Sequence, residues 1–502
     1  MAELFWYWNR DAFLPQPPAR AGRDTAPLPG GGTSAASVAD AWLVAATAAA
    51  NPEDRAAALY ALGCAGPGSH GGPILERALE DADADVREAA LLALGEHAGT
   101  RARFRLVREF DDPSRSLAHR RTAALAYGIA CAVDGGGSGR ALRPFVAGLE
   151  DPGCREAACA ADALNVGLGD VGPRAGARAA DDDGSALAPV LGPWVAGYRA
   201  GDPLPALGVV LLAGSTPKPA VAAALAKLLD AKVDPVRYAA RAAMLQFGDV
   251  AFATLAGWAD APSPSERAFA CFAAVGHPEF RQLAEKALQQ PALRGIAALG
   301  LALHLRRTGG VAARRALEDA ARNQRTFAER PLWLLALALV EDPAVGARAT
   351  AILQDSRAAV ALRLAAADVL ALPTDADRTA LRRAVHLDPE PAVRWLAADG
   401  IARHGAADDV RTLAYAVEHA GTAADRAALL VAFGRCRHVS ALPVLRRWCQ
   451  DEAAPAEVRR AAWRGLALWL RHSGPAALAR LPRGVAFAYL PSWQLDLADR
   501  LR

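Results

Sequence analysis

Residues 75–99 read LERALEDADADVREAALLALGEHAG, and the pattern of this stretch decides the fold. A leucine-containing segment is followed by an acidic turn at residues 81–85, and aspartate is a preferred capping residue at a helix N-terminus. Val86, Ala90 and Leu94 then recur at a spacing of four, which places them on one face of a second helix. The stretch therefore predicts two helices joined by a short acidic turn, with two glycines marking the end of the second helix.

The same pattern returns at residues 228–248, 385–405 and 448–470, and an arginine marks each repetition. Such arginines follow one another at intervals of 27 to 36 residues, apart from one interval of 82 residues. This series, which we call the arginine ladder, consists of Arg55, Arg87, Arg121, Arg155, Arg237, Arg267, Arg294, Arg330, Arg363, Arg394, Arg426 and Arg459. Self-similarity at such a period predicts a solenoid of stacked helix pairs, and the long interval leaves room for a degenerate unit and an insertion.

The repeated unit resembles HEAT repeats, in the short form shared with the phycobilisome-lyase-like group. The resemblance covers roughly residues 38–475. It implies an all-α fold, a right-handed α-α superhelix of about twelve or thirteen helix pairs. The composition agrees, because 53% of the chain is hydrophobic but only 6% is aromatic, so alanine and leucine supply the apolar surface. We therefore expect one elongated array and not several globular domains.

Three segments depart from the repeat. Residues 1–37 form an arm with an aromatic cluster followed by turn-rich Pro and Gly stretches, which cannot hold a helix. We expect this arm to cap the first repeat, with a partner-docking peptide or disorder as alternatives. Residues 168–189 lack apolar periodicity and predict an exposed insertion loop, either functional or merely tolerated. Residues 476–502 contain scattered large apolar side chains and predict a C-terminal cap.

Charge and cysteine content narrow the classes of protein. The net charge is +3, from 57 basic and 54 acidic residues, which is too balanced for a protein that follows a phosphate backbone. The seven scattered cysteines predict free buried thiols in a reducing compartment. No apolar run approaches the roughly 20 residues of a membrane span, and no signal peptide is recognised. We expect a soluble cytoplasmic protein that has no membrane span and does not bind nucleic acid.

The arginine ladder predicts a structural role. An arginine at the second position of each second helix can reach back to the acidic turn of its own or the preceding unit, where aspartates such as Asp83 and Asp388 are near in sequence. A charge-assisted pair repeated in every unit would fix the angle between neighbouring units. A ligand site would instead concentrate its special residues in a few units.

The position that follows each ladder arginine varies between units, as recognition positions do. It includes Tyr238, Trp395 and Arg460, and Trp463 lies one helical turn after Arg460. Large aromatic side chains are frequent anchors at protein interfaces. These four residues are our candidate partner-binding residues on the concave surface. Half of the members of this stripe are small or apolar, so an ordinary packing role is the alternative.

Signatures of catalysis, cofactors and metals are lacking in the sequence. Helical-repeat deoxyhypusine hydroxylases, which are similar in fold, hold two irons through His-Glu dipeptides, and no His-Glu dipeptide occurs here. Cysteine and histidine spacings do not fit a zinc site, and the glycine run at 135–139 is not a phosphate-binding loop. We therefore predict no catalytic, cofactor-binding or metal-binding residue.

The predicted function is that of a non-catalytic scaffold or adaptor, which binds a protein partner on its concave surface within a bacterial complex. The strong excess of arginine over lysine, together with the excess of alanine, is typical of a GC-rich genome, so the abundance of arginine itself says little about function. Two alternatives come from the resemblance: a ligand-binding protein like the bilin lyases, and a DNA-binding protein like the HEAT-like alkylpurine glycosylases. The partner and the oligomeric state remain open at this stage.

Overall fold

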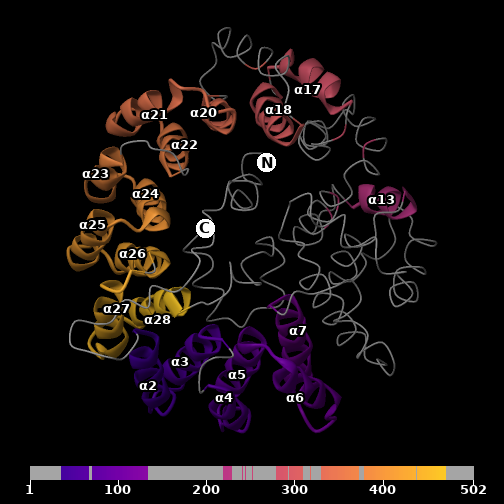
Figure 1. Ribbon diagram of the computed structural model, residues 1–502, viewed down its shortest axis with the longest axis vertical. Helices are drawn as coiled ribbons and strands as arrows, with labels where there is room; N and C mark the ends of the chain where they lie inside the picture. Colours follow the sequence, from indigo (N-terminus) through magenta and orange to yellow (C-terminus); the bar gives the residue numbers. More distant parts are fainter. Residues whose placement is uncertain are drawn as a thin grey trace.

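The computed structural model shows an array of helices (Figure 1). It describes residues 35–66, 71–133, 219–228, 240, 244, 252, 277, 279–291, 293–308, 317, 330–371, 378–436 and 438–470. Within these ranges every regular element is a helix and no strand occurs, so the all-α prediction is confirmed. Residues 1–34 of the predicted arm, the predicted insertion at 168–189 and the predicted cap at 476–502 lie outside the described residues, as do Arg155, Arg237, Tyr238 and Arg267. The arm was predicted to extend to residue 37 without a helix, which is wrong for residues 35–37, because they begin the first described helix.

The N-terminal helices form consecutive pairs. They are α2 (Ala35–Ala46), α3 (Pro52–Cys64), α4 (Gly72–Ala78), α5 (Ala84–His97), α6 (Thr100–Asp111) and α7 (Leu117–Val133). In each pair one helix packs on the next: α2 on α3, α4 on α5 and α6 on α7. The second helices also pack on one another, α3 on α5 and α5 on α7, which is the stacking predicted for a solenoid.

The C-terminal helices repeat this arrangement. They are α17 (Phe280–Leu288), α18 (Arg294–Thr308), α20 (Arg330–Leu339), α21 (Val345–Gln354), α22 (Val360–Leu370), α23 (Thr379–Leu387), α24 (Pro391–His404), α25 (Ala407–Glu418), α26 (Ala423–Arg435), α27 (Ala441–Gln450) and α28 (Ala456–Leu470). Helices α18, α20, α22, α24, α26 and α28 pack on one another in that order. Together with α3, α5 and α7 they form the inner row of Figure 1, and α4, α6, α17, α21, α23, α25 and α27 lie outside it.

Local sequence signals account for the helix starts. Asn51 accepts a hydrogen bond from the N–H of Glu53, with proline at the first turn of α3, and Asp83 accepts from the N–H groups of Asp85 and Val86. The acidic turn thus supplies the cap that the sequence predicted. The end of α5 differs from the prediction, because the helix continues through Gly95 to His97.

Gly95 lies inside the helix because its missing side chain is needed for packing. A Cβ atom at Gly95 would lie 2.6 Å from the carbonyl oxygen of Ala126 in α7. The same holds for Gly63, whose Cβ would lie 2.3 Å from the Ala93 oxygen, and for Gly434, at 2.0 Å from the Gly465 oxygen. These glycines bring neighbouring backbones of the inner row into direct contact, and buried alanines and leucines fill the rest of the seam.

The two ends of the described chain meet. Helix α28 packs on α3 as one inner helix packs on the next, and in Figure 1 α27 and α28 lie beside α2 and α3. The described helices therefore follow one another around a ring, with α13 (Pro219–Ala226) between α7 and α17 (Figure 1). An elongated array with its ends covered by the arm and the C-terminal cap was expected, whereas among the described residues the end units cover each other. We call this contact of α2 and α3 with α27 and α28 the closing junction.

No helix in the described ranges is both long and apolar enough to cross a membrane. Four of the seven cysteines lie in these ranges, and all four are buried and free, as predicted for them: Cys64, Cys131, Cys436 and Cys449.

Replacing Gly434 by Ala should destabilise the array, because the new Cβ would overlap the backbone of α28 and force the helices apart. We expect the free energy of unfolding to fall by about 1–3 kcal/mol. Chemical denaturation followed by circular dichroism measures this change. Gly346→Ala in α21 is the matched control, since nothing lies within 4 Å of its Cβ. Equal midpoints for the two variants would contradict the role assigned to Gly434.

Candidate functional site

The ladder arginines occupy a fixed place in the inner helices. In seven inner helices, α3, α5, α7, α22, α24, α26 and α28, an arginine is the fourth helical residue and not the second as predicted. From there the side chain donates to backbone carbonyls of the turn before its own helix. Arg55 donates to Ala49 and Ala50, both at 3.0 Å, and Arg394 donates to Asp388 and Pro389 at 2.9 and 3.2 Å.

The other edge of the guanidinium reaches a carboxylate of the following unit. Arg55 pairs with Asp81 at 3.0 Å, Arg363 with Asp388 at 3.0 Å and Arg394 with Asp425 at 2.8 Å. From the sequence, we predicted that each ladder arginine would pair with an aspartate of its own or the preceding unit. That prediction is wrong. The turn of the same unit offers carbonyl oxygens to one edge of the guanidinium, which leaves its other edge facing the next inner helix. Each of these three arginines so connects its own turn with the following unit.

Some units vary this contact. In α7 the ladder position belongs to Arg120, whose Nε donates to the Phe110 oxygen at 2.7 Å, and the predicted Arg121 is exposed. In α18 the arginine is the first helical residue, and Arg294 donates to the Leu288 oxygen at 2.9 Å. Arg426 donates to the carbonyls of two residues at the end of α25 and beyond it, Val417 and Ala420. The side chain of Arg330 lies outside the described residues.

Trp395 is held beside the ladder. Its Nε1 donates to Oδ1 of Asp425 at 2.8 Å, and the same carboxylate accepts two hydrogen bonds from Nη2 of Arg394. Burial opposes ionisation of Asp425, but the hydrogen bonds from Trp395, Arg394 and Thr422 outweigh it and lower the pKa of this carboxyl. Trp395 is therefore a half-buried indole whose orientation is fixed by an ionised partner in the next inner helix.

The other described candidates lie at the closing junction. Trp463 retains 4% of its exposure and stacks on Trp42, with ring centroids 5.1 Å apart and planes 3° from parallel. Arg460 lies 3.5 Å from a carboxylate oxygen of Glu53. While the junction is closed, Trp463 is thus covered by α2 and is not presented to a partner. Of the four candidates, Trp395 alone is described away from the junction.

The closing junction repeats the rule of the ladder. Arg459 lies 3.7 Å from Asp54, which is the third residue of α3, just as Asp425 is the third residue of α26. Arg446 of α27 adds a cation–π contact, 5.5 Å from the centroid of Trp42. No sequence signal could assign Trp42 and Asp54 to this contact, because their partners lie some 400 residues away in the chain.

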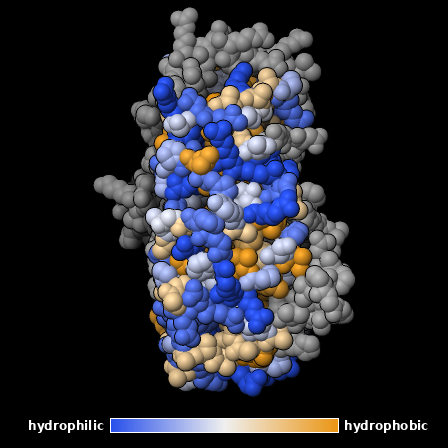
Figure 2. Space-filling model, turned by 90° about the vertical axis from the view of Figure 1, so that its left-hand side faces the viewer, coloured by the Kyte–Doolittle hydropathy of each residue, from blue (hydrophilic) through white to orange (hydrophobic). Residues whose placement is uncertain are grey.

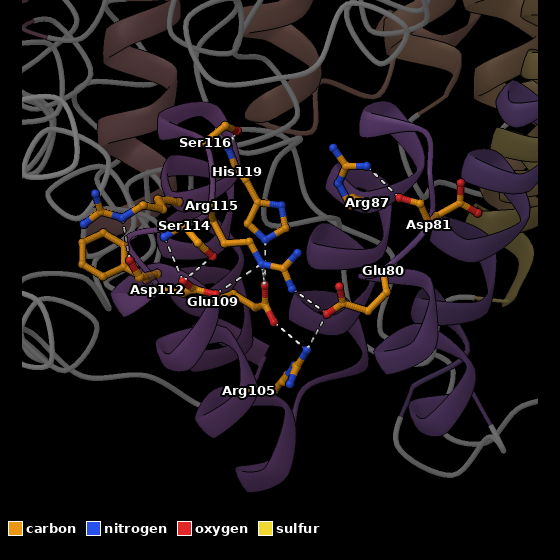
Figure 3. A network of polar contacts seen from close by, with 12 residues as sticks. Glu80, Asp81, Arg87, Arg105, Glu109, Asp112, Ser114, Arg115, Ser116 and His119 are labelled. Atoms are coloured by element: carbon orange, nitrogen blue, oxygen red, sulfur yellow. Dashed lines mark hydrogen bonds and ion pairs between the residues drawn. The ribbon is translucent and has the colours of Figure 1, made fainter.

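A buried ionic network connects the second and third helix pairs (Figure 3). Glu109 of α6 lies at its centre, with His119 Nε2 at 2.8 Å, Arg105 Nη2 at 2.6 Å and Arg115 Nε at 3.0 Å. Arg115 also pairs with Glu80, at 2.5 Å, on the preceding unit. Two arginines and the imidazole of His119 surround this one buried carboxylate, so the network satisfies its charge and holds the units in register.

Burial is the main influence on the pKa of His119. Burial lowers the pKa of its imidazole, although Glu109 opposes this by favouring the charged form. In the described part of the chain no three His, Cys, Asp or Glu side chains gather as a metal site would need. The polar groups of this region therefore form structural contacts between units.

Replacing Arg363 by Gln should be strongly destabilising, because its ion pair with Asp388 is buried, with 4% and 3% of the two side chains exposed. Loss of the arginine leaves Asp388 as an unpaired buried charge, which costs about 3–5 kcal/mol. Denaturant unfolding measures the loss. Arg101→Gln removes a pair with Glu76 in which the arginine side chain is 80% exposed, and we expect no measurable change there. A result in the reverse order would refute the buried role of the ladder at this unit.

The stability of the array should decrease in mild acid. His119 has a folded-state pKa below its ordinary value of 6.5, so the unfolded chain takes up the proton first as the pH falls. The stability contributed by neutral His119 is complete above about pH 7 and is lost progressively as the pH falls below about 6.5. His386 and His404 shift in the same direction through burial.

His119→Asn should therefore reduce the difference in unfolding free energy between about pH 7.5 and about pH 5.5, even though it lowers stability at both. Urea titrations at the two pH values measure that difference. An unchanged or larger difference in the variant would contradict the assignment to His119.

Comparisons with known proteins match the architecture only. No protein-family model and no curated protein matches the sequence. Among solved structures the chain is similar to the karyopherin Kap121p bound to the SUMO protease Ulp1p, with 12% identity and a TM-score of 0.33, over 86% of this chain and 53% of that one. It is also similar to the complex of CpcE and CpcF of phycocyanin lyase from Nostoc sp. PCC7120, with 20% identity and a TM-score of 0.29, over 51% of this chain and 98% of that one.

The chain spans about half the length of the karyopherin it matches. At these identities and TM-scores, no partner or activity is transferred to this chain. The repeated helix pairs, the continuous inner row and the arginine ladder are observations on the chain itself. By these features it is an all-α array of stacked helix pairs, the architecture that the resemblance to HEAT repeats implied.

Proposed function

We propose that the protein is a non-catalytic scaffold or adaptor that binds a protein partner along its inner row of helices. The observation that carries the proposal is the fixed indole of Trp395, half-buried in α24 and hydrogen-bonded to Asp425 of α26. Trp395 occupies the variable position next to an invariant structural arginine. A position that differs between units, beside one that repeats, is where a repeat protein places its specificity.

A preoriented tryptophan is well suited to anchor a partner. Its side chain buries a large apolar area, and the bond to Asp425 removes much of the rotational freedom that binding would otherwise have to restrict. Tryptophan is also strongly enriched among the residues that dominate binding energy at protein interfaces. Its indole N–H is already satisfied, so covering Trp395 with an apolar partner side chain leaves no donor of this ring unpaired.

The outer row supports the same assignment by contrast. The face over α21, α23 and α25 is mostly hydrophilic, with hydrophobic residues scattered in small groups (Figure 2). Tyr415 and Leu387 are exposed there, at 57% and 68%, but scattered apolar side chains are normal for a solvated surface. Three of the described buried carboxylates, Asp388, Asp425 and Glu109, are engaged with arginines. Partner binding needs only complementarity and agrees with such a surface.

The test is affinity purification from the native host, followed by measurement with the identified partner. Trp395→Ala should weaken binding at least about thirtyfold, the effect of losing one anchor residue, while the circular-dichroism spectrum stays unchanged. Tyr415→Ala is the matched control, because it removes an exposed aromatic side chain from the outer row, and it should bind as the native chain does.

Unchanged affinity of the Trp395→Ala variant would remove the case for this surface. Retention of duplex DNA with a steep salt dependence would instead favour the DNA-binding alternative. Visible absorbance after incubation with a bilin would favour the ligand-binding alternative.

A further inference from the structure

The two units that meet at the closing junction are not joined by a short stretch of chain, unlike the units at the other described contacts. Neighbouring inner helices elsewhere, such as α24 and α26, are joined through one outer helix and two turns. Across the closing junction, Glu53 and Arg460 are 407 residues apart, and no short segment connects α28 to α3. A break between two covalently joined units leaves them within reach of each other, whereas a break at the junction lets the two ends part.

The arginine–aspartate contact at the closing junction is weaker than its counterpart between α24 and α26. At the contact of α24 with α26, Arg394 makes two hydrogen bonds to Asp425, at 2.8 and 2.9 Å, and Trp395 makes a third. At the closing junction the corresponding arginine, Arg459, lies 3.7 Å from Asp54 without a hydrogen bond between them. Arg459 and Asp54 thus hold the same helical positions as Arg394 and Asp425, but they lie farther apart.

Two buried donors at the closing junction have no hydrogen-bond partner. They are Nε of Arg459 and Nε1 of Trp463. A buried donor that is not hydrogen-bonded has lost its water without compensation, so exposing it again is favourable. The remaining pair, Arg460 with Glu53, is partly exposed and therefore sensitive to salt. Apolar contact favours closure, and these polar groups favour release. Other buried nitrogens of the array, such as Trp333 Nε1 and Arg378 Nε, also lack a hydrogen-bond partner, but the units that carry them are joined by the chain and cannot part.

We propose that the closing junction is a latch at which the ring of helices opens, so that the chain exchanges between a closed ring and an open arc with all helix pairs intact. Opening would expose Trp42 and Trp463 and widen access to the inner row. That a partner gains access to the inner row in this way rests on the proposed function. The opening itself does not depend on a partner.

A native thiol reports on the latch. Cys449 of α27 is 5% exposed, and burial, with a contribution from the nearby Asp54 carboxylate, raises the pKa of its thiol well above the ordinary value. Since Asp54 belongs to α3, Cys449 faces the closing junction and is unreactive while the junction is closed. Cys131 and Cys436, both buried in other units, serve as internal references.

The experiment is alkylation of the native chain with iodoacetamide, read at each cysteine by peptide mass spectrometry. We expect Cys449 to react faster than Cys131 and Cys436, and its rate to rise about two- to fivefold when sodium chloride is raised from about 0.05 to about 0.5 M. Arg459→Gln should raise the Cys449 rate by a similar factor at low salt. Arg394→Gln removes the equivalent pair at a continuous contact, and the Cys449 rate should stay as in the native chain.

A charge exchange separates the latch from general destabilisation. Glu53→Arg places like charges opposite Arg460 and should speed the alkylation of Cys449, whereas Glu53→Arg combined with Arg460→Glu restores an opposite pair and should return the rate to the native value. Equal rates at the three thiols in all conditions would show exposure by global unfolding only, and would overturn the proposal. So would an equal acceleration by Arg394→Gln and Arg459→Gln, or a double variant that stays as fast as Glu53→Arg.

Discussion

The close approach of consecutive inner helices is the constraint on which the rest of the structure depends. At Gly63, Gly95 and Gly434 the backbone of one inner helix touches the backbone of the next, where any side chain would overlap a carbonyl group. Helices that approach so closely gain dense packing from small side chains, which explains an apolar composition dominated by alanine and leucine. The outer helices, which pack mainly on their own inner helix, are placed by this inner row and not the reverse.

This close approach also brings the N-terminal ends of neighbouring inner helices together, and the arginine ladder exploits that geometry. The turn before each inner helix carries carbonyl oxygens that need donors, and the next unit carries a carboxylate near the start of its inner helix. A guanidinium has donors on two edges in a rigid plane, so one side chain serves both. Lysine offers a single point charge and could not connect Asp388 and Pro389 with Asp425 as Arg394 does. The excess of arginine in the chain thus includes a set with a defined structural task.

The helix pairs could be predicted from the sequence because their signals are local. The spacing of apolar residues, the caps at Asp83 and the proline-marked starts all act within a few residues, and the period of the arginines showed that the units repeat. The direction of the ladder contacts was not predictable, since spacing along the chain does not tell which neighbouring unit a long side chain reaches. The choice between Arg120 and Arg121 failed for a related reason, because an Arg-Arg pair fixes no helical register by itself. Trp395 was found from its variable position, but its bond to Asp425 depends on the angle between units.

The closing junction could not be predicted from local sequence signals, and the reason lies in the geometry of the whole array. An array of identical contacts turns by a small angle at each unit, and whether its ends meet depends on the sum of those angles, which no single repeat encodes. Once the ends do meet, the surfaces that face each other are the two halves of the ordinary contact between units, so the rule that joins Arg394 to Asp425 also brings Arg459 to Asp54. Closure then buries apolar end surfaces that an open array must cover with dedicated caps. It also leaves one contact without a covalent connection, and small errors of angle accumulated around the ring are taken up there. The longer distance of Arg459 to Asp54, at 3.7 Å against 2.8 Å for Arg394 and Asp425, is what such an accumulated mismatch predicts for the junction.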